Sequence, residues 1–300
     1  MGTNVSNGLF RAGYVAFIGR PNVGKSTLLN SLLKQKTAIV SPKPQTTRNR
    51  ILGILHGDNF QIICLDTPGL IDPSTMLQKS LVKTSVRTIK DADLIYVIID
   101  AKRLTSDDEI VFSYTEKAST PALLVINKTD LVKKGELLPL MAEMDSKGLF
   151  KDILPVSALN KEGLDVLISA TLENLPSGMP FYPPDIISDE PERFFVAEII
   201  REQIFLQFGE EIPYATAVKI TEFKERPHRK DFISAAILVE RSSQKGIMIG
   251  RQARALKKLG TAARAEIEKF LGRSIFLELH IQVRKGWRKD PAKLKDLGYL

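Results

Sequence analysis

Residues 19–26 read Gly19-Arg20-Pro21-Asn22-Val23-Gly24-Lys25-Ser26 and match the pattern G-x-x-x-x-G-K-[ST] in full. An apolar run at 14–18 precedes them, and a stretch with helical spacing at 26–33 follows. This combination predicts a strand, a glycine-rich loop and a helix, in which backbone N–H groups and the helix N-terminus bind phosphate oxygens. We expect Lys25 to reach the β- and γ-phosphates of a nucleotide and the Ser26 hydroxyl to bind Mg²⁺.

Four more apolar runs follow along the chain, at 61–65, 94–99, 122–126 and 153–156, and helical segments separate them. Near-continuous apolar strands that alternate with helices are typical of parallel strands buried on both faces. The sequence therefore predicts an α/β fold, with a mostly parallel sheet covered by helices on both faces.

Two motifs that follow predicted strands narrow the choice of nucleotide. Asp66-Thr67-Pro68-Gly69 places a carboxylate at a strand end, where Asp66 can hold Mg²⁺ through water and the Gly69 N–H can approach the γ-phosphate. Asn127-Lys128-Thr129-Asp130 follows another strand, and the Asp130 carboxylate can accept hydrogen bonds from N1–H and the 2-amino group of guanine. Adenine has neither donor at that edge, which argues against an ATP-dependent small-molecule kinase.

A third motif, Ser157-Ala158-Leu159, follows the last predicted strand and can supply a backbone N–H to the guanine oxygen. The motifs occur in the required order, each at the carboxyl end of a strand, and predict a site for GTP or GDP with Mg²⁺. The nucleotide-binding residues expected on these grounds are Asn22, Val23, Gly24, Lys25, Ser26, Thr27, Asp66, Gly69, Asn127, Lys128, Asp130, Ser157, Ala158 and Leu159.

Composition and length fit a globular protein of two domains, because 300 residues with 43% hydrophobic content can bury a substantial core. Residues 175–184 are crowded with proline, glycine and serine, so we place the first domain at 1–178 and the linker with the second domain at 179–300. The single cysteine, Cys64, excludes a disulfide framework and favours a reducing, cytoplasmic setting.

The positive charge is concentrated in the C-terminal half of the chain. The net charge is +8 and the segment from Lys219 to Lys295 carries 20 Lys and Arg against 8 Asp and Glu, which favours a polyanionic partner such as nucleic acid. This half predicts a small α+β module with helices at 192–208 and 250–271 and strands at 216–223, 232–240 and 275–283.

A tight turn precedes the second of these helices, and basic side chains surround it. A loop of this kind ahead of a helix N-terminus suits the backbone of single-stranded RNA. The expected RNA-binding residues are Lys245, Gly250, Arg251, Gln252, Arg254, Lys257 and Lys258. The element order resembles the bacterial, type II KH fold, in which 249–253 occupies the place of the G-x-x-G loop; the second glycine is Ala253 here, which adds a Cβ where phosphate approaches.

The nucleotide motifs resemble those of translation-factor-class GTPases, and Pro44-Gln45-Thr46-Thr47-Arg48 resembles the first switch segment of the Era group. The resemblance implies that Thr47 reaches Mg²⁺ and the γ-phosphate, with Thr46 as the less favoured choice. Ras-like GTPases carry a water-orienting glutamine where this chain has Leu70, so we assign no catalytic base and expect a low intrinsic rate of GTP hydrolysis. In related GTPases the asparagine equivalent to Asn22 helps to hold K⁺.

A single G domain followed by a KH module resembles the Era family over nearly the whole chain. That resemblance implies a monomeric GTPase switch that binds small-subunit ribosomal RNA near its 3′ end and acts in small ribosomal subunit assembly, with ribosome-assembly proteins as further partners. A different interpretation stays open, in which the basic half binds a protein or an anionic membrane surface, with peripheral contact at the inner membrane, rather than RNA.

Overall fold

The computed structural model describes residues 9–299, which group into two compact units. The first unit holds the described residues up to 38, with 47–72 and 81–189, and the second holds 39–46, 73–80 and the described residues from 190 onward. Residues 179–189, which we expected in the C-terminal part, group with the first unit.

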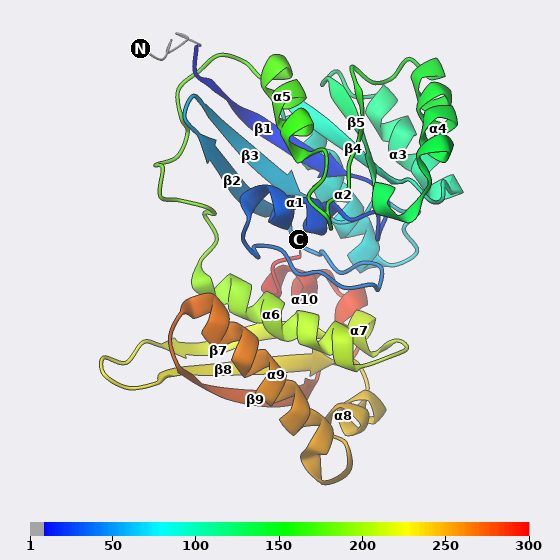
Figure 1. The fold of residues 1–300 in the computed structure, drawn as a ribbon. Helices are drawn as coiled ribbons and strands as arrows, with labels where there is room; N and C mark the ends of the chain where they lie inside the picture. Colours follow the sequence, from blue (N-terminus) through cyan, green and yellow to red (C-terminus); the bar gives the residue numbers. More distant parts are fainter. Residues whose placement is uncertain (1–8, 300) are drawn as a thin grey trace. The chain divides into compact units, whose positions relative to one another are not determined.

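The first unit is built on a six-stranded sheet with the strand order β2-β3-β1-β4-β5-β6 (Figure 1). Its strands are β1 Arg11–Ile18, β2 Ile51–Gly57, β3 Phe60–Asp66, β4 Leu94–Asp100, β5 Ala122–Asn127 and β6 Ile153–Pro155. All neighbouring strands are parallel except β2, which is antiparallel to β3. The predicted α/β fold with a mostly parallel sheet is therefore confirmed.

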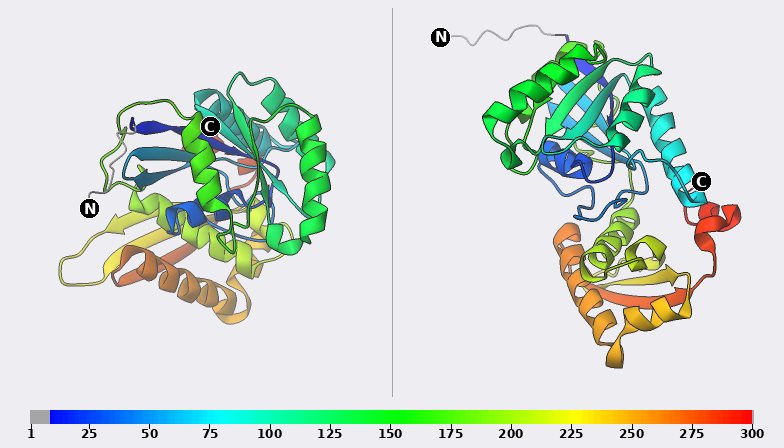
Figure 2. Two further views of the ribbon diagram at one scale, coloured as in Figure 1. Left: turned by 45° about the horizontal axis from the view of Figure 1, so that its top comes forward. Right: turned by 90° about the vertical axis from the view of Figure 1, so that its right-hand side faces the viewer.

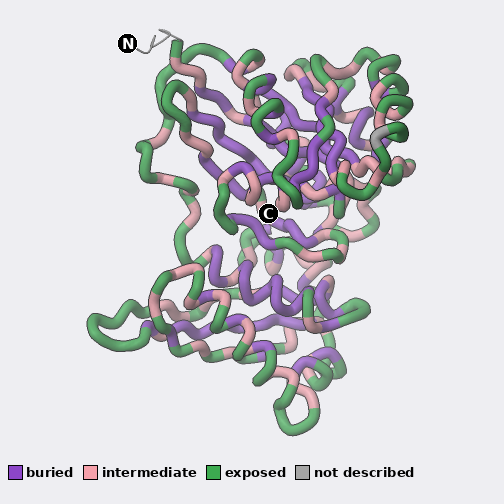
Figure 3. The backbone as a smooth tube through the Cα atoms, viewed as in Figure 1, coloured by how far each residue is buried: buried purple, intermediate pink, exposed green. Residues whose placement is uncertain are grey.

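Helices cover both faces of this sheet. They are α1 Lys25–Leu33, α2 Met76–Asp91, α3 Ser106–Glu116, α4 Lys134–Ser146 and α5 Leu164–Asn174, with a 3₁₀ turn η1 at Thr129–Leu131. Side chains of α2, α3 and α4 share one apolar core with alternate residues of β1, β4 and β5. On the other face the Tyr96 hydroxyl of β4 bonds Thr171 of α5. Figure 3 shows the central strands as buried.

Strand β2 is an element that the sequence analysis did not identify. Its register with β3 pairs Ile51 with Asp66 and Gly57 with Phe60, so the two strands form a hairpin. The segment that follows α5 runs along β2: the Ile54 N–H donates to the Ile187 carbonyl at 2.7 Å. Gln61 also accepts the backbone N–H groups of Phe181 and Tyr182, which explains why 179–189 groups with the first unit.

The second unit has a three-stranded sheet in the order β7-β8-β9, antiparallel between the first pair and parallel between the second. Its elements are α6 Glu192–Gln207, α7 Ile212–Ala215, β7 Ala217–Lys224, β8 Asp231–Val239, α8 Ser242–Ile249, η2 Arg251–Ala253, α9 Arg254–Leu271, β9 Ile275–Val283, η3 Trp287–Lys289 and α10 Pro291–Asp296. Helices α6, α8 and α9 share one core on one face of the sheet (Figure 2).

The single tryptophan belongs to this packing. Trp287 is fully buried and its indole N–H donates to the Ala215 carbonyl at 3.0 Å, so it serves the fold rather than an exposed surface. Within residues 9–299, none of the helices is both long enough and apolar enough to cross a lipid bilayer.

Candidate functional site

The glycine-rich loop joins the end of β1 to the start of α1, and its geometry leaves no room for a side chain at Gly24. Gly24 has φ +98°, and a Cβ there would lie 2.3 Å from Nδ2 of Asn127. Any other residue would therefore strain the backbone and displace Asn127.

Lys25 lies inside this loop. Its ammonium donates to the carbonyls of Gly19 and Arg20, each at 2.9 Å. Burial lowers the pKa of Lys25 to about 8, because a charged ammonium loses water there, although the nearby Asp66 carboxylate opposes the shift. An anionic phosphate in the loop would restore the charge on this side chain.

Three oxygen donors from separate segments meet beside the loop. The Ser26 hydroxyl donates to Asp66 Oδ2 at 2.7 Å and lies 2.9 Å from Thr47 Oγ1, and the Thr47 hydroxyl donates to Asp66 Oδ2 at 3.4 Å. The Thr46 hydroxyl instead donates to the Lys43 carbonyl at 2.7 Å. The arrangement brings together the three residues expected at Mg²⁺ and favours Thr47 over Thr46.

Asp66 shows that this set of donors fits a hard cation. The residue is fully buried, and its Oδ1 has no hydrogen-bond partner among the residues that the structure describes. Burial raises the pKa of Asp66 to about 6, against the opposing effects of Lys25, Ser26 and Thr47. A buried carboxylate oxygen without a partner, beside two hydroxyls, matches the oxygen ligands that Mg²⁺ prefers.

The Asp66–Gly69 segment passes close to the phosphate loop. A Cβ on Gly69 would lie 2.7 Å from the backbone N of Pro21, and the Leu70 N–H donates to the Gly19 carbonyl at 3.1 Å. The Leu70 side chain is fully buried in the sheet core. It can neither face nor orient a water molecule at the γ-phosphate.

Asn127 ties the remaining loops together. Its Nδ2 donates to the Val23 carbonyl at 2.8 Å, and its Oδ1 accepts the Ala158 N–H at 3.0 Å. The residue is buried, so both bonds are shielded from water. One amide therefore fixes the phosphate loop against the segment expected to contact guanine.

The other predicted guanine-site residues lie around this amide. Lys128 donates to the Asn22 carbonyl and to Asp100 Oδ2, each at 2.7 Å, and Ser157 donates to Asp130 Oδ1 at 2.5 Å. Thr27 lies in the first turn of α1, and Leu159 is 74% exposed.

Sequence reasoning missed two acidic residues that hold this site. Asp100, the last residue of β4, pairs with Lys128 at 2.7 Å. Buried Asp108, near the start of α3, accepts from Arg20 Nε at 3.0 Å and so anchors the phosphate loop. The position of Asp100 directly after a predicted strand was a usable signal, whereas the Arg20–Asp108 contact joins residues too distant in sequence to be inferred.

In the second unit, the predicted RNA-binding turn joins α8 to α9. Gly250, Gln252 and Ala253 have φ angles of +71°, +52° and +58°. The side chains of Arg251, Arg254, Lys257 and Lys258 are exposed and Lys245 is half-buried. Helix α8 was not predicted, and the helix expected at 250–271 begins only at Arg254 because the turn interrupts it.

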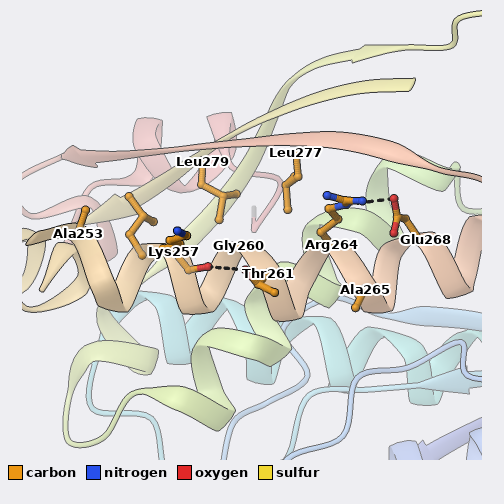
Figure 4. A pocket seen from close by; sticks show the side chains of 10 residues that line it. Ala253, Lys257, Gly260, Thr261, Arg264, Ala265, Glu268, Leu277 and Leu279 are labelled. Atoms are coloured by element: carbon orange, nitrogen blue, oxygen red, sulfur yellow. Dashed lines mark hydrogen bonds and ion pairs between the residues drawn. The ribbon is translucent and has the colours of Figure 1, made fainter. Parts of the chain in front are cut away.

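A groove of about 660 Å³ starts at this turn and runs between α9 and β9 (Figure 4). Its lining residues are Ala253, Leu256, Lys257, Gly260, Thr261, Arg264, Ala265, Glu268, Leu277 and Leu279. Only Lys257 among the predicted RNA-binding residues lines the groove. The groove has an apolar floor and a charged rim, which suits nucleic-acid bases below and a phosphate backbone at the edge.

The isolated histidines do not form a metal site. His56 Nε2 lies 2.8 Å from the Ile186 carbonyl oxygen, and His280 lies beside Glu278. Over the described part of the chain, the His, Cys, Asp and Glu residues make no cluster of three that could hold a metal ion.

Comparison with known proteins gives two family matches. The family described as 50S ribosome-binding GTPase matches residues 14–128, and the KH domain family matches residues 211–288. The chain is 46% identical over 297 residues to the GTPase Era of Geobacter metallireducens, covering 98% of this chain and 100% of that one. It is 45% identical over 293 residues to the GTPase Era of Syntrophus aciditrophicus, covering 97% and 96%.

Two solved structures are also similar along nearly the whole chain. One is an Aquifex aeolicus Era variant bound to GDP and AlF4⁻, with a TM-score of 0.93. The other is an Era in complex with MgGDPNP and nucleotides 1506–1542 of 16S ribosomal RNA, with a TM-score of 0.94. Each is 40% identical to this chain and covers 97% of it and 99% of the solved chain.

Proposed function

The chain belongs to the Era family of GTPases, and we propose on that basis that it is a GTP-hydrolysing switch whose KH unit binds the 3′ region of small-subunit ribosomal RNA during small-subunit assembly. The observation that carries the switch is the convergence of Ser26, Thr47 and Asp66 within 3.4 Å of one another. Thr47 lies outside helix α1 and strand β3, which carry Ser26 and Asp66, so its position beside them depends on how the intervening segment folds.

The nucleotide site is assigned from these contacts. Lys25 and the loop N–H groups bind the phosphates, and Asp130 reads guanine with Asn127, Lys128 and Ala158 in support. The hydroxyls of Ser26 and Thr47 would hold Mg²⁺, with Asp66 holding it through water, and the ion would supply positive charge to the phosphates.

Hydrolysis by the unassisted chain is slow in this proposal. Leu70 is buried in the core and cannot orient water, so we expect roughly 10⁻⁴ to 10⁻² turnovers per second, as in unassisted switches. If Asn22 helps to hold K⁺ in place of an arginine charge, hydrolysis is faster in KCl than in NaCl at equal ionic strength. Equal rates of GTP hydrolysis in the two salts would show that K⁺ has no role in the reaction.

RNA binding is supported by the groove between α9 and β9 and the basic turn at its end. An apolar floor is of no use to a flat anionic membrane surface, so the groove favours RNA over the membrane alternative. We place the protein in the cytoplasm, where its ribosomal RNA target is made.

The deciding experiment measures binding of fluorescent RNA, nucleotides 1506–1542 of 16S ribosomal RNA, to the full chain with a non-hydrolysable GTP analogue. We expect tight binding that weakens in Lys257→Ala and changes little in Lys102→Ala, an exposed lysine of the first unit. Equal affinity for a shuffled RNA of the same length would contradict the proposed target.

A further inference from the structure

The sheet of the second unit has a face that the groove does not use. Successive side chains of a strand point to opposite faces, so Leu277 and Leu279, which line the groove, point to the helix side of β9. Phe276 therefore lies on the opposite face, and 56% of it is exposed.

Phe276 lies next to a second aromatic ring, which in turn contacts a guanidinium group. It is the register partner of Phe232 on β8, and the two rings are stacked with centroids 5.9 Å apart and planes 13° apart. The guanidinium carbon of Arg226 lies 5.2 Å from the centroid of the Phe232 ring. A cation over one ring, with a second ring beside it, leaves an open aromatic surface at Phe276.

The β7–β8 hairpin holds Arg226 in this position. The Arg226 N–H donates to Asp231 Oδ1 at 2.9 Å, and the Arg229 N–H donates to the Arg226 carbonyl at 3.2 Å. Buried Asp231 in turn accepts from Arg273 Nε at 2.6 Å. The hairpin turn is thus tied to the sheet although residues 224–230 are all exposed (Figure 3).

The acidic side chains near the rings mostly contact cations. Arg273 binds Glu192 and Asp231 and lies 4.0 Å from Glu225, and Lys224 is paired with Glu222. Within residues 9–299 the cations Arg226, Arg229 and Lys230 make no ion pair closer than 4.0 Å, although Arg226 lies near Asp231 and Lys230 near Glu268. The surface made by Arg226, Arg229, Lys230, Phe232 and Phe276, here called the hairpin patch, therefore presents cations without ion pairs next to the half-buried Phe232 ring and the exposed Phe276 ring.

We propose that the hairpin patch is a second RNA contact, which stacks an unpaired base on Phe276 while Arg226, Arg229 and Lys230 meet the neighbouring phosphates. Aromatic rings flanked by unpaired cations are the combination with which proteins bind single-stranded nucleic acid. A protein partner would need a wider apolar surface, whereas the exposed residues that follow Phe276 on this face are Glu278, His280 and Gln282.

One RNA can reach both sites. Strand β9 is the edge of the sheet, so a chain that leaves the groove can pass around this edge to Phe276. The inference rests on the proposed function, because it assumes that the groove holds RNA.

The test measures affinity of the full chain for the same RNA, nucleotides 1506–1542 of 16S ribosomal RNA, in Phe276→Ala and in Phe276→Tyr. Loss of one stacked base predicts a roughly tenfold weaker Kd for the alanine variant and near-normal affinity for tyrosine, which keeps the ring. Gln282→Ala, an exposed residue on the same face of β9, is the matched control and should bind normally.

A second readout is salt dependence. Arg229→Ala should reduce the slope of log Kd against log salt by about 0.7, as expected for one lost phosphate contact on a single strand. Suppose that the wild-type chain binds the RNA and that Lys257→Ala weakens this binding. If Phe276→Ala and Arg229→Ala then bind as well as Gln282→Ala does, the hairpin patch is not an RNA contact. In that case only this inference is lost. If wild type binds no RNA, the proposed function fails as well.

Discussion

Replacement of Gly24 by alanine tests whether the phosphate loop and the guanine-reading loops form one rigid site. A side chain at φ +98° costs about 1–2 kcal/mol in the left-handed region. The new Cβ would lie 2.3 Å from Asn127 Nδ2, so Asn127 must move and weaken its bonds to Val23 and Ala158. A lost buried bond costs about 1–3 kcal/mol, so we expect a total near 3 kcal/mol.

This cost is shared between folding and binding. If the loop keeps its shape, the strain lowers the thermal unfolding temperature, by about 2–4 °C for each kcal/mol in a protein of this size class. If the loop opens instead, GDP binding weakens, by as much as roughly a hundredfold for 3 kcal/mol. The assay therefore pairs a thermal melt without nucleotide with titration of a fluorescent GDP analogue.

Gly135→Ala is the matched control. Nothing lies within 4 Å of a Cβ at Gly135, which is inside helix α4, so alanine there should be neutral or stabilise by up to about 1 kcal/mol. If Gly24→Ala changes stability and GDP affinity by less than 1 kcal/mol in sum, Asn127 does not couple the two loops as described.

Three further predictions concern single side chains. Asp130→Asn should shift preference from guanine toward xanthine nucleotides, as measured by competition binding, and retained selectivity for GTP would contradict the assigned contact. Because burial lowers the pKa of Lys25 to about 8 and a bound phosphate restores its charge, GDP binding should take up protons near pH 8 but not at pH 6.5, and affinity should fall as pH rises above 8. Calorimetry in buffers of different ionisation enthalpy counts these protons, and zero uptake at pH 8 would refute the role of Lys25. Ala253→Gly should raise stability by about 0.5–1 kcal/mol, because Ala253 has φ +58°, and should tighten RNA binding if phosphate approaches this turn as we expect; unchanged melting and unchanged Kd would argue against both effects.

The order of motifs was enough to predict the nucleotide-binding fold, because each motif ends an apolar strand and such strand ends meet at one edge of a parallel sheet. Strand β2 was not predictable in the same way. Gly53 interrupts its apolar run, and its antiparallel pairing with β3 depends on register rather than on composition. Helix α8 was missed because eight residues ended by Gly250 give too short a periodic pattern.

The same distinction between motif residues and tertiary packing applies to the candidate sites. Residues within motifs were predictable from their spacing, and Ser26, Asp66 and Thr47 do come together. The groove was not predictable from sequence, because it is formed by helix and strand residues whose apolar side chains look like ordinary core positions. Leu256, for example, packs against the core of the second unit and also lines the groove.

The two packing units do not correspond to two continuous stretches of the sequence. The chain passes from one unit to the other after residues 38, 46, 72, 80 and 189. Within the second unit, the Val40 N–H donates to Glu202 Oε1 at 3.0 Å, and the Lys43 ammonium donates to the Phe205 carbonyl at 2.5 Å. A truncation at residue 178 would thus retain segment 39–46 without the helix that supports it. An exchange of C-terminal halves between relatives would keep the Val40 contact only where the new half supplies an acceptor like Glu202, whereas the carbonyl that Lys43 uses is part of the main chain.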